Sequence, residues 1–89
     1  MDTQKFTTKE FKEKLEATHD FPTLYMFKFI VLEEKKEEVK ALFPLNDVVY
    51  KPSSKGKYMS VTAKVMAPSS DFVIGIYQKA HQIQGIIAL

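Results

Sequence analysis

Two stretches of alternating side chains, residues 24–31 and 58–66, constrain the fold of this chain more than any other feature. In the first stretch, Tyr25, Phe27 and Phe29 lie on one side and Lys28 on the other. A period of two is typical of a strand with one buried face, and lysine is rarely fully buried, so we expect the aromatic side to face the core. The second stretch also alternates, with apolar Met59, Val61, Ala63 and Val65. Both stretches are therefore predicted to be strands that turn their apolar sides to the same layer of helices.

The segments that follow these two strands each predict a helix. Residues 33–43 combine an apolar stripe with a charged face, and Pro44 is expected to end the helix. The second helix is predicted to start at Ser69 or Ser70 as N-cap and to end at Gly85. Its buried stripe is predicted to contain Val73, Ile76, Tyr77, Ala80 and Ile83.

Shorter segments complete the pattern. Two further strands are predicted at residues 47–51 and 86–89. Residues 52–57 have the composition of a turn, so the strand at 47–51 is expected to form a hairpin with the strand at 58–66. A short helix over residues 8–18, with Phe6, Phe11 and Leu15 as its apolar residues, precedes the first strand.

The resulting order, βαββαβ after an initial helix, predicts the fold class. We expect an α+β fold of the ferredoxin-like split βαβ kind: a two-layer sandwich with a four-stranded antiparallel sheet in the order 4-1-3-2. Residues 1–89 would form a single domain, with an N-terminal helical extension over residues 1–20 and the βαββαβ core over residues 21–89. One face of the sheet would be left open.

Composition narrows the possible partners and surroundings. The chain has no cysteine, so disulfides and thiolate metal sites are excluded. All 13 of its basic residues are lysines, and arginine is the residue best suited to phosphate and guanine recognition. No apolar segment approaches the ~20 residues that span a bilayer, and the polar start does not resemble a signal peptide. We therefore expect a cytoplasmic protein with no membrane partner.

The strongest family resemblance lies in residues 52–62, Pro-Ser-Ser-Lys-Gly-Lys-Tyr-Met-Ser-Val-Thr, together with residues 21–23 and the aromatic strand through Phe29. Over residues 20–89 the chain resembles the YbeD-like bacterial family of unknown function. The resemblance implies a ferredoxin-like fold related in shape to ACT regulatory domains, which bind small effectors at dimer interfaces. Members are often labelled lipoate-related regulatory proteins. Val31 and Leu32 depart from the glycine that we expect after the first strand in such proteins.

The predicted hairpin turn is one candidate ligand site. Two hydroxyls, two ammonium groups and a glycine at a hairpin tip could bind an anion. Alternatively, the residues serve the turn itself, with Gly56 at positive φ and the serines capping the backbone. The candidate ligand residues are Ser53, Ser54, Lys55, Gly56, Lys57 and Tyr58.

The open sheet face is a second candidate site, for a partner. Met26, Lys28, Ile30 and Ile87 would lie on this face or at its edge. Exposed apolar surface at a sheet edge invites pairing. We expect the N-terminal helix to cover part of this surface and a second copy to cover the rest, as a homodimer; alternatively, the helix covers all of it within a monomer.

The sequence contains no recognisable catalytic set, so we do not expect an enzyme. His19 and His81 have no partners at metal-ligand spacing, and neither a metal nor another cofactor is predicted. The open face offers one aromatic residue, Tyr58, for stacking, so nucleic acid is not the expected ligand. We expect a regulatory or binding module that senses a small-molecule effector or binds a partner protein; the alternative is an anion or nucleic-acid binder that uses the hairpin turn from Ser53 to Lys57.

Overall fold

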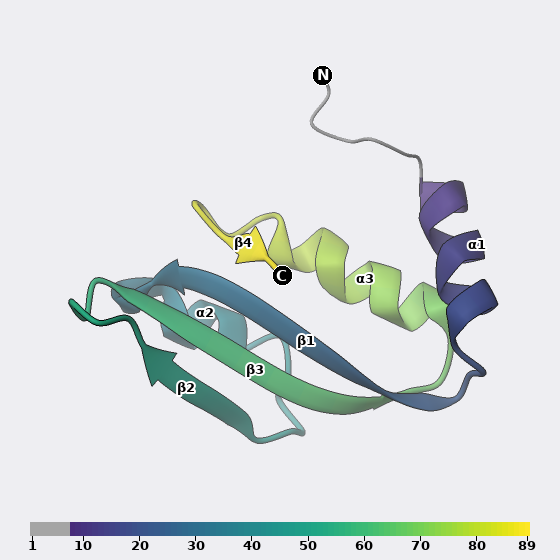
Figure 1. Cartoon of the computed structure of the whole chain (residues 1–89), viewed down its shortest axis with the longest axis horizontal. Coiled ribbons are helices and arrows are strands. Elements are labelled where there is room, and N and C mark those ends of the chain that lie inside the picture. The colour runs from purple at the N-terminus through teal and green to yellow at the C-terminus, as the bar shows by residue number, and fades with distance from the viewer. Residues whose placement is uncertain (1–7) are drawn as a thin grey trace.

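The computed structural model describes residues 8–89, so Phe6 lies outside the described part. Its elements follow the predicted order (Figure 1). The helices are α1 (Thr8–Thr18), the short 3-10 helix η1 (Glu33–Lys35), α2 (Lys36–Lys40) and α3 (Ser70–Ala80). The strands are β1 (Thr23–Leu32), β2 (Val48–Pro52), β3 (Tyr58–Ala67) and β4 (Ile87–Ala88).

The four strands form one antiparallel sheet in the order β2-β3-β1-β4. The long central strands β1 and β3 pair along their whole length, from Thr23 opposite Ala67 to Leu32 opposite Tyr58. β4 is a two-residue edge strand, shorter than the predicted segment 86–89, and β2 forms the other edge. The α+β sandwich, its antiparallel sheet and its strand order are thus as predicted.

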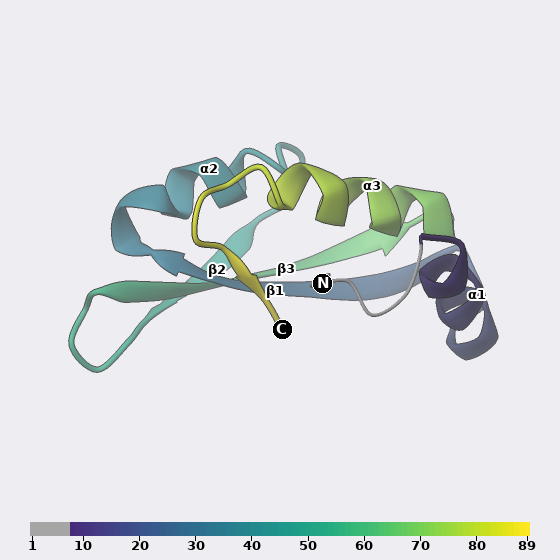
Figure 2. The ribbon, with the colours of Figure 1, turned by 90° about the horizontal axis from the view of Figure 1, so that it is seen from above.

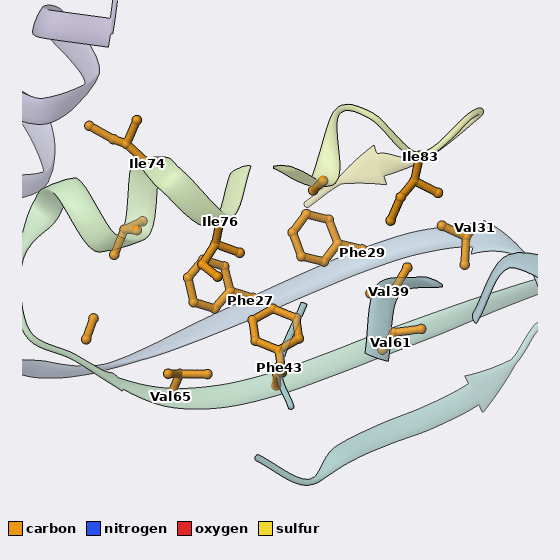
Figure 3. Packing of buried hydrophobic residues seen from close by; sticks show 14 of the residues in the cluster. Phe27, Phe29, Val31, Val39, Phe43, Val61, Val65, Ile74, Ile76 and Ile83 are labelled. Atoms are coloured by element: carbon orange, nitrogen blue, oxygen red, sulfur yellow. The ribbon is translucent and has the colours of Figure 1, made fainter. Parts of the chain in front are cut away.

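The core lies between the sheet and the helices, on the aromatic side of β1 (Figure 3). Phe27 and Phe29 are fully buried, and the Phe27 ring lies 5.3 Å from Phe43 and 5.4 Å from Tyr77, between ring centroids. The register places Phe29 opposite Val61, so both strands turn their apolar sides to the same layer. The predicted orientation of both strands is confirmed.

The helix after β1 is shorter than the predicted span of residues 33–43. It begins as the 3-10 turn η1, and α2 ends at Lys40. Beyond that point, Leu42 and Phe43 donate backbone hydrogen bonds to the carbonyls three residues earlier, and Phe43 is 2% exposed. This tighter turn brings the Phe43 ring into the core before Pro44.

The second main helix also ends earlier than predicted. Ser69 is its N-cap and accepts a hydrogen bond from the Phe72 amide, but α3 ends at Ala80 rather than near Gly85. Gln82 and Ile83 continue with bonds to the carbonyls three residues before them, which turns Ile83 into the core. Gly85 has a φ of 77° and occupies the turn before β4.

The helix α1 packs against α3 rather than covering the open face (Figure 2). Leu15 of α1 belongs to the buried core, and the ring of Phe11 lies 5.7 Å from that of Tyr77. Across the same contact, the Ser70 hydroxyl donates to the Glu16 carboxylate at 2.7 Å, and Lys12 pairs with Asp71 at 2.9 Å. The expectation that this helix covers part of the open sheet face is therefore wrong.

The contact with α1 also explains a buried residue that the helical stripe did not include. Ile74 is 7% exposed and points toward α1 rather than toward the sheet (Figure 3).

In the described part of the chain, no helix has the length and apolar character needed to cross a membrane.

A candidate binding site on the open sheet face

The sheet face opposite the helices, called the open face below, carries large apolar side chains in contact with solvent. The alternate positions of β1 and β3 that do not enter the core point to this side, and the register pairs them in rows across the sheet. Leu24, Met26, Val49, Met66 and Ile87 are each more than half exposed on it.

Lysine is the only charged residue type in the strands. Lys28 lies opposite Thr62, Lys64 opposite Met26, and Lys51 opposite Ser60, so all three lysines project from the open face. The four strands contain no aspartate or glutamate, and no ion pair within residues 8–89 involves these lysines. Asp47 lies immediately before β2. The open face therefore combines apolar surface with positive charge that no described residue pairs.

One row across the sheet creates a depression near the hairpin. Ile87, Ile30, Ser60 and Lys51 lie side by side on β4, β1, β3 and β2. Ser60 is short and lies between longer neighbours, so the surface sinks at the centre of the row. We call the resulting open cavity, of about 400 Å³, the hairpin hollow. It is lined by Lys28, Ile30, Lys51, Pro52, Ser53, Tyr58, Ser60 and Leu89.

Polar groups of the hairpin turn beside this hollow form hydrogen bonds with one another. The Ser53 carbonyl accepts from the Gly56 amide at 2.9 Å, and the Ser53 hydroxyl accepts from the Tyr58 amide at 3.2 Å. Gly56 has a φ of 73°, which a residue with a side chain rarely adopts. These contacts support the interpretation in which the residues shape the turn.

The ammonium groups of the hairpin remain at the surface. Lys55 and Lys57 are exposed, and the Lys57 ammonium lies 5.7 Å from the centre of the Tyr58 ring. This contact holds positive charge beside a wall of the hairpin hollow.

Comparison with known protein families matches residues 16–89 to the family described as protein of unknown function (DUF493). The chain belongs to this family. No curated protein and no solved structure matched the chain. The range matched to the DUF493 family contains every residue that lines the hairpin hollow, whereas residues 8–15 of α1 precede it.

In this DUF493 protein, the structure brings the two predicted sites together in part. Ser53 and Tyr58 of the hairpin line the hollow with Lys28 and Ile30 of the predicted partner surface. Ser54, Lys55, Gly56 and Lys57 form the tip of the turn and are not among its lining residues. Ile87 lies opposite Ile30 in the sheet, and Met26 lies further along β1. Whether either set binds a ligand stays a prediction.

The sequence prediction missed Lys51, Pro52, Ser60 and Leu89 as lining residues. Lys51 and Ser60 had a usable signal, because both occupy outward positions of their strands, but the pairing of β2 with β3 was needed to place them side by side. Leu89 follows β4, and its amide donates to the Lys28 carbonyl at 2.9 Å, which places it beside β1. No local pattern indicated that contact.

The two histidines of this DUF493 protein lie apart from the open-face site. His19 Nδ1 is 2.9 Å from the Thr18 hydroxyl, and its ring lies 5.3 Å from that of Tyr25. His81 is the exposed C-cap of α3. Within residues 8–89, no three histidine, aspartate or glutamate side chains come together as a potential metal site.

Proposed function

We propose that this DUF493 protein is a small binding module without catalytic activity, which holds an anionic ligand with an apolar part in the hairpin hollow. The observation that carries the proposal is the placement of Lys28 and Lys51 at a hollow whose other walls include Ile30, Pro52 and Leu89. Lysine ammonium groups suit a carboxylate, sulfonate or phosphate, and the aliphatic walls suit a hydrocarbon or ring. A volume of about 400 Å³ lies within the range of small-molecule sites.

Such a ligand would act as an effector, in line with a regulatory role of the ACT-like kind that the YbeD-like resemblance suggests. Only part of the ligand would be covered, because the hollow is open to solvent. A partner protein or a second copy that recognises the occupied face would then bind only when the ligand is present. The binding module would transmit a signal through this surface.

A second candidate function is binding of a larger anion, including nucleic acid, through the hairpin. The exposed ammonium groups of Lys55 and Lys57 next to the hollow favour it. Phosphate contacts would make the affinity fall steeply with salt, whereas burial of an apolar part would keep much of it. Among residues 8–89, Tyr58 is the one aromatic side chain on the open face, which gives bases little to stack on.

A fluorescent anionic probe tests the proposed function. The probe 1-anilinonaphthalene-8-sulfonate joins a sulfonate to aromatic rings, and N-phenyl-1-naphthylamine is a close analogue without the charge. We expect the folded protein to bind the sulfonate probe more tightly than the neutral one. Lys28→Met and Lys51→Met should each weaken sulfonate binding about three- to tenfold, because each removes one cation at the hollow.

Lys79→Met is the matched control, because Lys79 is an exposed lysine on α3, away from the sheet. Its affinity for the sulfonate probe should equal that of the wild type. Circular dichroism of each variant must match the wild type, since this probe also binds partly unfolded chains. Equal binding of the two probes, or equal loss in all three variants, would refute the proposed site.

A further inference from the structure

A second part of the open face, next to the hairpin hollow along β1 and β3, has a different composition. In the register of β1 and β3, Leu24 lies opposite Met66, and Met26 lies opposite Lys64. Leu24, Met26 and Met66 are 57%, 55% and 61% exposed. We call these three neighbouring side chains the methionine patch. Lys28 lies on β1 between the patch and the hollow, and Leu24 at the far end of the patch is six positions from Ile30 of the hollow, a distance of about 20 Å.

We propose that the methionine patch, flanked by Lys28 and Lys64, is a docking surface for an acidic amphipathic segment of another protein. Three adjacent large apolar side chains in solvent are typical of an interaction site, and methionine adapts its shape to different partners. Both flanking charges are positive and unpaired within the described residues. A segment with leucine-like residues on one side and glutamate or aspartate at its borders matches this arrangement.

Charge argues against a second copy as the occupant. A two-fold contact between two open faces would place the same surface against itself. The lysines of one face would then oppose those of the other, and the strands supply no acidic residue to offset them. Like charges brought together in this way disfavour association.

The patch also lacks the features that bind nucleic acid. Its side chains are aliphatic or thioether, so bases have no aromatic surface to stack on. The chain has lysine and no arginine to contact phosphate and guanine. The apolar part of the patch therefore favours a protein segment.

The methionines themselves report on the docking. Met26 and Met66 lie in the patch, whereas Met59 is 7% exposed on the core side of β3 and serves as an internal control. The full chain, labelled with ¹³C in its methionine methyl groups, would be titrated with an amphipathic helical peptide of about 20 residues that carries leucines on one face and glutamates on the other. The matched peptide has lysine in place of every glutamate.

We expect the glutamate peptide to shift the methyl signals of Met26 and Met66 and to leave that of Met59 in place, and the lysine peptide to shift none. Lys64→Glu should weaken binding of the glutamate peptide at least about tenfold, while Lys79→Glu leaves it unchanged. Lys64 is exposed on the open face, so its substitution leaves the core intact.

Several results would overturn the docking proposal. They are the absence of shifts at Met26 and Met66, equal shifts with both peptides, and equal movement of Met59. Methyl shifts that depend on protein concentration alone would assign the patch to a second copy, and shifts with an oligouridine but not with the peptide would assign it to nucleic acid. The two proposed sites fail separately, because Lys64→Glu should spare binding of the sulfonate probe and Lys51→Met should spare the peptide.

Discussion

The hydroxyl groups of Tyr25 on β1 and Tyr77 on α3 lie 3.3 Å apart and join the sheet to the helix layer by a hydrogen bond. The ring of Tyr77 also lies 5.4 Å from that of Phe27. Burial is the largest of the effects that raise the pKa of the Tyr77 hydroxyl far above its usual value, and the hydrogen bond with Tyr25 raises this pKa further. The native fold therefore requires Tyr77 to keep its proton.

This raised pKa predicts a loss of stability at alkaline pH. In the unfolded chain Tyr77 loses its proton near pH 10, whereas in the folded chain it keeps it to higher pH. The unfolded state then binds fewer protons, so the free energy of unfolding falls as the pH rises above 10, by at most about 1.4 kcal/mol per pH unit for one group. Urea unfolding of the wild type and of Tyr77→Phe, at pH 8 and near pH 11, measures the effect. The two variants differ only at residue 77, so the difference between their free energies of unfolding isolates its hydroxyl. A stability difference that does not change with pH would contradict the prediction.

The two sides of β1 should respond very differently to truncation. Phe27 is fully buried and Met26 is 55% exposed, although they are neighbours in sequence. Phe27→Ala should lower the free energy of unfolding by about 3–5 kcal/mol or prevent folding, because it leaves a cavity in the core. Met26→Ala should change it by about 0.5 kcal/mol or less. Chemical denaturation followed by circular dichroism compares them, and similar costs would show that the strand faces are assigned wrongly.

Two glycines should give effects of opposite sign when changed to alanine. Neither Gly56 nor Gly75 has an atom within 4 Å of an added Cβ, so only the backbone decides. Gly56→Ala should destabilise the protein by about 1–2 kcal/mol, because its φ of 73° is left-handed. Gly75→Ala, within α3, should stabilise it by about 0.5–1 kcal/mol. Thermal unfolding of both variants provides the measurement; a stabilising Gly56→Ala would refute the turn geometry.

The N-cap of α3 should be a measurable contribution to stability. The Ser69 hydroxyl accepts a hydrogen bond from the Phe72 amide at 3.2 Å. Ser69→Ala should cost about 1 kcal/mol, because that amide loses its acceptor. Ser54→Ala, at the exposed hairpin tip, is the control and should stay within about 0.5 kcal/mol of the wild type. Equal effects in denaturant unfolding would exclude the cap.

The strands could be predicted from sequence because a period of two fixes which side chain faces the core. The placement of Phe27, Phe29 and Val61 followed from that period together with the presence of Lys28 on the other side. The ends of α2 and α3 could not be predicted in the same way. Both helices end in tight turns that carry Phe43 and Ile83 into the core. The residue at which each helix ends therefore depends on the space between the helices and the sheet.

The candidate site could be predicted only in part. The outward side of β1 gave Lys28 and Ile30, but the hollow also needs Ser60 and Lys51, which lie in the same row only because of the register of three strands. The position of α1 depended on contacts with α3, such as the bond from Ser70 to Glu16, which join residues 54 positions apart in sequence. Sequence patterns describe one element at a time, whereas the site is formed between elements.

The proposed role of the open face is tested most directly by mapping where the anionic probe binds. Amide nitrogen–proton correlation spectra of the wild type would be recorded during titration with 1-anilinonaphthalene-8-sulfonate. Binding in the hairpin hollow should shift the amide signals of Ile30, Lys51 and Ser60 most strongly and leave those of α3 unchanged. Shifts concentrated on α2 and α3, or the absence of any saturable shift, would contradict the account.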